Sequence, residues 1–253
     1  MKIDYKNNKL TFFKKITGTN FPDLAGLNKF KPKGDAVLAM LGYVKEDFDP
    51  FYTKRGALAE KLAFMSLTKR NHKCVTYDPN KIFYDNFPND PYFGGMIDIE
   101  IPSENTLYEI KSRNIKDYDK ISKYGDVAQE NQALHYGFLR HYKQVHIMWI
   151  FFDDETEELI RNDKPVTTYK NLKMFEKTLD VNFDEQAKLH KDALLYYIHC
   201  LAYQAVPIED ISDKYLELLN KKRPEPKPVS NNSQNGNTAK PVQIQLNLFG
   251  EES

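Results

Sequence analysis

Apolar residues recur at helical spacing along residues 51–67, "FYTKRGALAEKLAFMSL". Leu58, Leu62 and Met65 fall on one stripe of this segment, which predicts an amphipathic helix that buries the stripe. Glu60 belongs to the same helix and lies roughly a third of a turn from the centre of the stripe. The next two stretches, "KCVTYD" (73–78) and "KIFYDN" (81–86), are expected to be strands.

Apolar and polar residues alternate in two runs within residues 94–112, "GGMIDIEIPSENTLYEIKS". Successive strand side chains face opposite sides, so the isoleucines of the first run are expected on one face: Ile97, Ile99 and Ile101. In the second run, Glu109 and Lys111 share a face. If the two runs pair through the short "PSEN" connection, then Asp98, Glu109 and Lys111 converge on one outer face.

Later segments predict a helix over residues 126–142, a buried strand over 144–152, an acidic loop at "DDETEE" (153–158) and helices over 183–206 and 208–221. This order predicts an α/β (α+β) fold, with a mixed central β-sheet flanked by helices and further helices at its C-terminal end. We expect one domain over residues 1–222, with its core at about 51–152 and a helical part at about 182–222. The Pro-, Asn- and Ser-rich residues 223–242 are expected to be a flexible linker before a tail at 243–253.

Composition excludes several classes of protein. The 253 residues are 41% hydrophobic, which is enough for a sizeable core, and no apolar run approaches the length of a membrane span. The first ten residues lack the apolar stretch of a signal peptide, so we expect a cytoplasmic protein of a bacterial cell without a membrane partner. A net charge of +0 predicts no nucleic-acid partner by itself, although residues up to about 75 are basic and could form a basic face.

The cysteines and histidines are poorly spaced for metal binding. Cys74 and Cys200 are far apart and have no histidine or cysteine at ligand spacing, which argues against an iron–sulfur cluster and a zinc ribbon. The six histidines form no His-x-x-x-His pair, so a zinc hydrolase is poorly supported.

Asp98, Glu109 and Lys111 suit the hydrolysis of a phosphodiester. Two carboxylates are hard oxygen ligands for Mg²⁺, and the backbone carbonyl of Ile110 is a candidate for a further ligand. The metal would polarise the phosphate and acidify a water, while the lysine steadies the nucleophile or the developing charge. The strands alone leave a second interpretation open, because a cross-strand Asp–Lys pair on a polar face is common in antiparallel sheets.

The spacing of these residues resembles a known signature. "GGMID", followed by "EIK" with Glu109 eleven positions after Asp98, is similar to the Asp…Glu-x-Lys signature of the PD-(D/E)XK nuclease superfamily. The resemblance implies a restriction-endonuclease-like core and a catalytic role for Asp98, Glu109 and Lys111. It also implies that Glu60, on the preceding helix, reaches the metal site. On its own, Glu60 is equally consistent with a solvated helix residue.

Flanking motifs extend the resemblance over residues 12 to about 152. "QALHY" matches the Gln-x-x-x-Tyr motif of RecB-like nucleases, which implies that Gln132 orients the active site and Tyr136 contacts DNA. Gln129, one turn earlier, competes for the role of the glutamine. Residues 15–60 are similar to the opening of the lambda-exonuclease-type recombination nucleases. That likeness implies DNA contacts from further residues: Thr17, Thr19 and Arg55.

The resemblance implies a Mg²⁺-dependent deoxyribonuclease, with Mn²⁺ as a substitute, of phage or bacterial origin. Its expected activity is the processing of duplex DNA ends as an exonuclease in recombination or replication. A single-strand annealing protein would be a second partner, and the lambda-type relatives form a homo-oligomer, a ring-shaped trimer. Arg113, just beyond Lys111, is a further candidate for a phosphate contact.

The tail contains one compact apolar cluster, "QLNLF". It resembles the Gln-Leu-x-Leu-Phe peptide with which bacterial replication proteins bind the β sliding clamp, through these residues: Gln245, Leu246, Leu248 and Phe249. An alternative is that the tail packs back on the parent domain. For the whole protein, two other functions stay open: a structure-specific or defence endonuclease with the same metal site, and a non-catalytic, clamp-tethered DNA-binding module.

Overall fold

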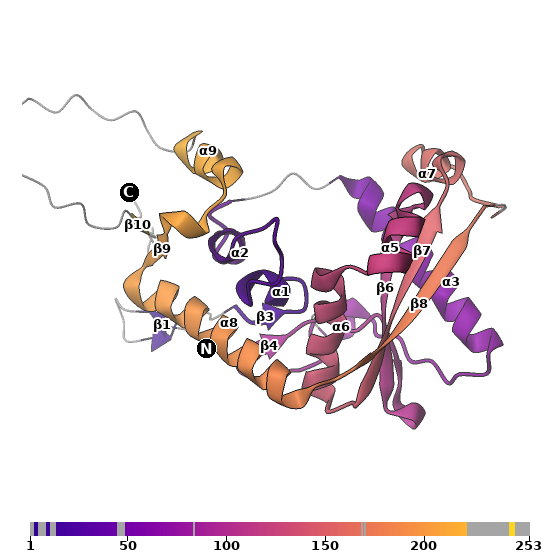
Figure 1. Cartoon of the computed structure of the whole chain (residues 1–253), viewed down its shortest axis with the longest axis horizontal. Coiled ribbons are helices and arrows are strands. Elements are labelled where there is room, and N and C mark those ends of the chain that lie inside the picture. Colours follow the sequence, from indigo (N-terminus) through magenta and orange to yellow (C-terminus); the bar gives the residue numbers. More distant parts are fainter. Residues whose placement is uncertain are drawn as a thin grey trace, which may run out of the picture.

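The computed structural model describes residues 3–4, 9–10, 14–44, 49–82, 84–167, 169, 171–221 and 243–245 (Figure 1). Its central element is a four-stranded mixed sheet of β5 (Ile99–Ile101), β6 (Thr106–Asn114), β7 (Gln144–Phe152) and β8 (Lys173–Asp180), in that order. β6 pairs antiparallel with β5 and parallel with β7, and β8 is antiparallel to β7. The predicted mixed sheet is confirmed, and β7 has the bounds expected from its apolar run.

The predicted hairpin joins β5 to β6 with Ile99 opposite Tyr108. Its turn is a short 3₁₀ helix, η1 (Pro102–Glu104), followed by Asn105 in the left-handed region at φ 50°. Asparagine tolerates this conformation better than most residues, so "PSEN" encodes the reversal of the chain.

Helices cover both faces of the sheet. On one face, α3 (Pro50–Lys69) packs Ala59, Ala63 and Leu67 against Ile110 and its neighbours, and α7 (Asp154–Arg161) lies next to α3. On the other face lie α5 (Tyr118–Tyr124) and α6 (Val127–Arg140), which pack on a cluster around Trp149. η2 (Ile115–Asp117) leads from β6 into α5. The acidic side chains of the hairpin are therefore enclosed by helices, and the expected outer face is covered.

Two details of the predicted packing are wrong. Met65 is 45% exposed, because α3 approaches the sheet most closely through its alanines; Leu58 and Leu62 of the expected stripe pack against the same cluster and are partly buried. Ile97 contacts the cluster on the α6 side, whereas Ile99 and Ile101 contact the cluster on the α3 side. The regular alternation begins only at Ile99, where β5 starts, so Asp98 sits at the irregular entry to the strand.

A second core lies beside the α6 face of the sheet. It is formed by α1 (Phe21–Leu24), α2 (Lys33–Met40), α8 (Phe183–Tyr203), β9 (Ala205–Pro207), η3 (Ile208–Asp210) and α9 (Asp213–Lys221). Both α1 and α8 contact α6, so α6 is shared by the two cores. Short strand pairs complete the description: β1 (Ile3–Asp4) with β2 (Lys9–Leu10), β3 (Ile16–Thr17) with β4 (Phe93–Gly94), and β9 with β10 (Gln243–Gln245).

Other expected elements differ from the structure. Residues 73–78 contribute a single bridge, between Val75 and Glu100, and the described part of 81–86 begins within a short helix, α4 (Pro79–Ile82). The expected acidic loop is α7, since Asp153 accepts a hydrogen bond from the Thr156 amide and the acids that follow favour a helix N-terminus. The edge strand β8 was not anticipated. The expected linker, 223–242, lies outside the described residues.

None of the helices within the described ranges combines the length and the apolar character needed to cross a membrane.

Candidate active site

The start of β5 brings one carboxylate to the middle of β6. Oδ2 of Asp98 accepts a hydrogen bond of 2.7 Å from the backbone amide of Ile110. This contact fixes Asp98 beside Glu109. Ile99 lies opposite Tyr108 in the antiparallel register, so Asp98 and Glu109 are the next residues outward along the hairpin. The hairpin thus delivers two acids that are eleven positions apart in the sequence to one place.

Lys111 lies two residues beyond Glu109 on the same face of β6 and completes a cluster of three charged groups. Its Nζ lies 2.6 Å from Oε1 of Glu109. The side chain of Glu109 is 1% exposed and that of Lys111 is 18% exposed, so this contact is shielded from bulk water. The predicted convergence of Asp98, Glu109 and Lys111 is present in the structure.

The electrostatics of the cluster are unbalanced. Burial, together with repulsion from Asp98, raises the pKa of Glu109 to about 8, and burial also raises the pKa of Asp98. Burial alone would lower the pKa of Lys111, but the charges of Glu109 and Asp98 outweigh it and raise that pKa. Oε2 of Glu109 is buried and accepts no hydrogen bond within the described part of the chain. With both acids ionised, the cluster would carry one uncompensated negative charge, which a proton on Glu109 or a cation would neutralise.

Glu60 approaches the same cluster from α3. Neighbouring protein atoms shield its carboxyl from water, and this desolvation, followed by repulsion from Asp98, raises the pKa of Glu60 to about 7. The residue as a whole is nevertheless exposed. Among the described residues, no three His, Cys, Asp or Glu side chains are close enough together to hold a metal ion. The structure thus presents a two-acid centre, Asp98 and Glu109, with Glu60 at its margin.

Three solved structures share this architecture. A phage-related exonuclease from Haemophilus somnus 129PT covers 76% of this chain and is itself covered to 96%, with a TM-score of 0.52 and 15% identity. An alkaline exonuclease from Laribacter hongkongensis, LHK-Exo, covers 83% of this chain and is covered to 94%, with a TM-score of 0.53 and 13% identity. LHK-Exo in complex with dAMP gives a TM-score of 0.54 at 13% identity. The chain has the fold of these exonucleases. The predicted restriction-endonuclease-like core is confirmed.

Sequence relatives cover much less of the chain. MG373 of Mycoplasma genitalium, an uncharacterized protein, is 34% identical over 94 residues, which are 37% of this chain and 34% of that protein. Its homolog in Mycoplasma pneumoniae is 30% identical over 89 residues, 35% of this chain and 32% of that protein. The chain therefore spans about a third of the length of the curated relatives that it matches. No protein-family model matches the chain.

Within this exonuclease fold, α6 distinguishes the two candidate glutamines. Oε1 of Gln129 accepts a hydrogen bond of 2.7 Å from the indole nitrogen of Trp149, so Gln129 links α6 to strand β7. Gln132 instead hydrogen-bonds the Tyr136 hydroxyl, and burial followed by the charges of Glu109 and Asp98 holds the pKa of Tyr136 well above its usual value. Of the two glutamines, Gln132 is the one linked to the acidic cluster.

Two glycines enclose Tyr136. A Cβ at Gly18 or at Gly95 would come within 2.6 Å of the tyrosine side chain, and Gly95 has a φ of +119°. Tyr136 is 2% exposed, so the expected DNA contact would require the chain around it to move. Thr17 lies beside Gly95, whereas Thr19 is exposed. The pattern of "ITGT" indicated the two threonines and gave no signal for Gly18, the residue between them that makes the close approach.

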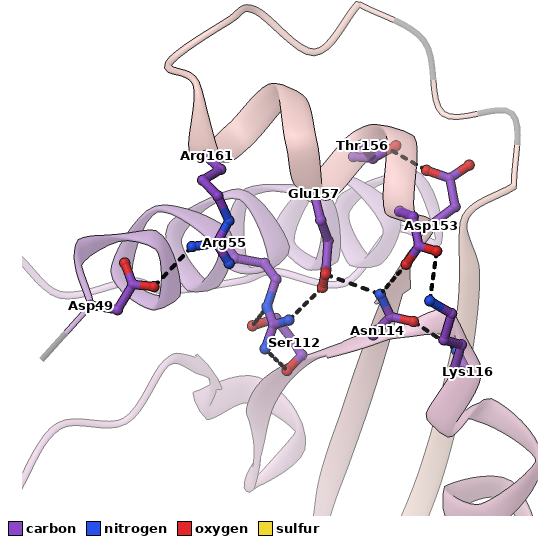
Figure 2. A network of polar contacts seen from close by, with 10 residues as sticks. Asp49, Arg55, Ser112, Asn114, Lys116, Asp153, Thr156, Glu157 and Arg161 are labelled. Carbon is purple, nitrogen blue, oxygen red and sulfur yellow. Dashed lines mark hydrogen bonds and ion pairs between the residues drawn. The ribbon is translucent and has the colours of Figure 1, made fainter.

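Arg55 lies in a polar network at the end of β6 and not on an open surface (Figure 2). Its guanidinium donates to Oε1 of Glu157 at 2.5 Å and to both the hydroxyl and the carbonyl of Ser112. Arg55 is 7% exposed, so the structure gives it a role in joining α3 to β6 and α7, and it is not free to meet a phosphate. Arg113 is more accessible, at 32% side-chain exposure, and pairs with Asp126 at 3.3 Å.

The candidate clamp-binding peptide is described only at its first residue. Gln245 ends β10, which pairs antiparallel with β9 so that Gln245 lies opposite Ala205. Leu246, Leu248 and Phe249 lie outside the described residues.

Proposed function

We propose that this protein is a divalent-metal-dependent deoxyribonuclease that hydrolyses phosphodiester bonds at the ends of duplex DNA. The observation that carries the proposal is the enclosed cluster of Asp98, Glu109 and Lys111, in which a buried carboxylate oxygen of Glu109 lacks a hydrogen-bond donor among the described residues. A cluster with this excess of acid is costly unless a cation compensates it. The fold shared with three exonuclease structures supports the same assignment.

The residues present fit a hard divalent cation. Asp98, Glu109 and the carbonyl of Ile110 would hold Mg²⁺, or Mn²⁺ as a substitute, and Glu60 would act from the outer side of the site. When bound, such a metal polarises the phosphate and lowers the pKa of a bound water. Glu60 is suited to hold a proton at its carboxyl, because its pKa of about 7 allows both protonation states near neutrality.

Lys111 would act on the phosphate. Its ammonium is held 2.6 Å from Glu109 and stays charged at neutral pH, since the two acids raise its pKa. A fixed positive charge at this place would stabilise negative charge that develops on the phosphoryl oxygens. Gln132 would orient the site through Tyr136, and the exposed Thr19 together with Arg113 would contact the DNA backbone. We assign Arg55 to the support of β6 instead of to DNA.

The experiment is a digestion of end-labelled linear duplex DNA with and without Mg²⁺, for the parent, Asp98→Asn and Lys111→Ala. Each substitution is expected to lower the rate by at least about 100-fold, because each removes a charge that acts on the phosphate. Glu104→Gln is the matched control, since Glu104 lies in the turn of the same hairpin and pairs with His72. Its rate should equal that of the parent.

Two results would count against the proposal. Equal Mg²⁺-dependent cleavage by Asp98→Asn would assign the chemistry to another centre. Cleavage of a covalently closed circle as fast as of the linear duplex would replace the exonuclease by an endonuclease with the same site. The same proposal includes three interactions: residues 245–249 bind a bacterial sliding clamp, the protein works with an annealing partner, and it forms a homo-oligomer. Each interaction requires its own binding measurement.

A further inference from the structure

The C-terminal half of α8 carries an exposed apolar stripe. Leu195, Ile198 and Tyr203 are 54%, 40% and 67% exposed, and His199 and Ala202 between them are also exposed. These five positions follow the i, i+3, i+4, i+7, i+8 pattern of one helix face. The opposite face of the same turns is buried in the second core through Ala193, Tyr197 and Cys200. α8 is therefore apolar on both sides over its last turns, and only one side is covered by described residues.

The stripe is confined to one end of the helix. One to two turns earlier, the same exposed face carries charged residues, Lys188, Lys191 and Asp192. The change from charged to apolar occurs over the last three turns before Tyr203, where α8 ends. This face therefore offers an apolar surface and, next to it, two lysines and one aspartate.

The chain itself returns to this end of α8. β9 starts at Ala205, two residues after α8 ends, and β10 lies beside it (Figure 1). Because the strands are antiparallel, Gln243 lies opposite Pro207 and Gln245 lies opposite Ala205. The backbone thus leaves β10 at the residue nearest to the C-terminal end of α8. The chain direction of β10 therefore points toward the end of α8 that carries the exposed stripe.

The length and the charge of the next residues match the stripe. From Tyr203 back to Leu195 the helix rises about 12 Å, and four extended residues cover about 13 Å. Those four residues are Leu246, Asn247, Leu248 and Phe249. Glu251 and Glu252 follow, at about 20 Å from Gln245, and Lys191 lies about 18 Å from Tyr203 along the helix. Apolar residues would then meet the apolar stripe, and the two glutamates would meet the two lysines.

We infer that the stripe on α8 is the docking surface for residues 246–252 of the same chain. Leu246 and Leu248, which lie on one face of an extended segment, cover the stripe of Leu195, Ile198 and Tyr203, and the acidic end pairs with Lys188 and Lys191. The clamp-binding role, which rests on the proposed function, uses these two leucines together with Phe249. Docking on α8 therefore withholds the peptide from a clamp until the clamp competes for it.

The test places a fluorescent reporter in the full chain by Leu248→Trp, on the face of the tail that meets the stripe, with the signal of the buried Trp149 subtracted. Docking predicts a blue-shifted emission for the new tryptophan and at least threefold slower quenching by acrylamide than for a free indole. The double substitution Leu195→Ser and Ile198→Ser should shift the emission to that of an exposed indole. Met65→Ser, which changes an exposed apolar residue on α3, is the matched control and should leave the emission unchanged.

A second readout keeps the test independent of one variant. In the otherwise unchanged chain, Leu246→Ser with Leu248→Ser should uncover the stripe and raise the binding of an apolar dye such as anilinonaphthalene sulfonate at least twofold. An exposed emission in the Leu248→Trp protein would overturn the inference, as would an emission that the α8 substitutions do not change. A blue shift that appears only at high protein concentration would also overturn it, because a second copy would then be the occupant. Neither readout depends on nuclease activity, so failure of the proposed function would be seen separately.

Discussion

Strand β6 carries two polar clusters side by side, one around Glu109 and Lys111 and one around Ser112 and Asn114. In the second cluster, every charged group meets a partner of opposite charge or a hydrogen-bond donor. Arg55 pairs with Glu157, Asn114 donates to Glu157 and Asp154, and Lys116 pairs with Asp154 (Figure 2). In the first cluster, two acids face one lysine, and one acid oxygen has no described donor.

The difference separates a charge-balanced network from a cluster with more acids than bases. The network around Arg55 joins three elements that are distant in sequence, because its donors and acceptors match in number and geometry. In the cluster around Glu109, burial raises the pKa of both acids, and repulsion from Asp98 raises that of Glu109 further. Burying these acids lowers the stability of the metal-free fold. The following substitutions should affect activity in the first cluster and stability in the second.

Glu109→Gln should have the largest effect. DNA cleavage is expected to fall at least about 100-fold, since a proposed metal ligand is lost. The metal-free protein should become more stable by about 1–2 kcal/mol, because Asp98 and Lys111 remain as one balanced pair. Cleavage assays and urea unfolding in a chelator measure the two effects. A protein that is less stable than the parent would show that the cluster is a structural ion pair.

Arg55→Ala should mainly lower stability. The substitution leaves Glu157 without its partner and removes two bonds to Ser112, so we expect the free energy of unfolding to fall by about 3 kcal/mol. Urea unfolding measures the change. Arg161→Ala is the matched control, since Arg161 pairs with Asp49 at the exposed surface, and its urea midpoint should not move. If Arg55→Ala were as stable as the parent but bound DNA weakly, Arg55 would be a phosphate ligand instead.

The buried pair of His135 on α6 and His190 on α8 should make the free energy of unfolding depend on pH. Nδ1 of His135 lies 2.9 Å from Nε2 of His190, burial lowers the pKa of His190 to about 4, and burial holds that of His135 well below its usual value. The unfolded chain takes up protons below about pH 6.5 and the folded chain does not. The free energy of unfolding should therefore fall between about pH 6.5 and 4, by up to about 3 kcal/mol for His190.

Urea midpoints at several pH values, for the parent and for His190→Gln, measure this dependence. The slope between pH 6.5 and 5 should be smaller in His190→Gln. His199→Gln changes an exposed histidine on the same helix and should retain the slope of the parent. An unchanged slope in His190→Gln would assign the pH dependence to other groups.

Lys116→Ala should have the smallest effect. The pair with Asp154 is short, at 2.6 Å, but both side chains are largely exposed, at 72% and 65%. Water and salt screen such a pair, so the urea midpoint should stay within the error of the measurement. A clear loss of stability would mean that the network around Arg55 extends cooperatively to the surface.

Much of the fold follows from local sequence patterns. The hairpin, α3, α6 and β7 were predicted because alternation, helical spacing and a short turn are encoded within a few residues. β8 was missed because this edge strand carries charged residues such as Lys173 and Glu176, which lower its apolar signal. The supposed strand near residue 81 starts as helix α4, and the acidic loop is α7, since capping outweighed composition there.

The candidate site was predictable only in part. Asp98, Glu109 and Lys111 were found because one hairpin brings them together. The position of Arg55 depends on Glu157, which is 102 residues away, and that contact has no local signal. In the same way, the sequence could not choose between Gln129 and Gln132, because the deciding hydrogen bond joins Gln129 to Trp149, which is 20 positions away.

The parallel pairing of β6 with β7 has a consequence for the newly made protein. On the ribosome, the hairpin of β5 and β6 emerges about 40 residues before the end of β7, and a parallel partner can join only after the α5–α6 crossover has folded. Until β7 arrives, β6 lacks the strand that pairs with it along Tyr108–Asn114, so the cluster of Glu109 and Lys111 is open on that side. The candidate active site is therefore complete only after β7 has left the exit tunnel.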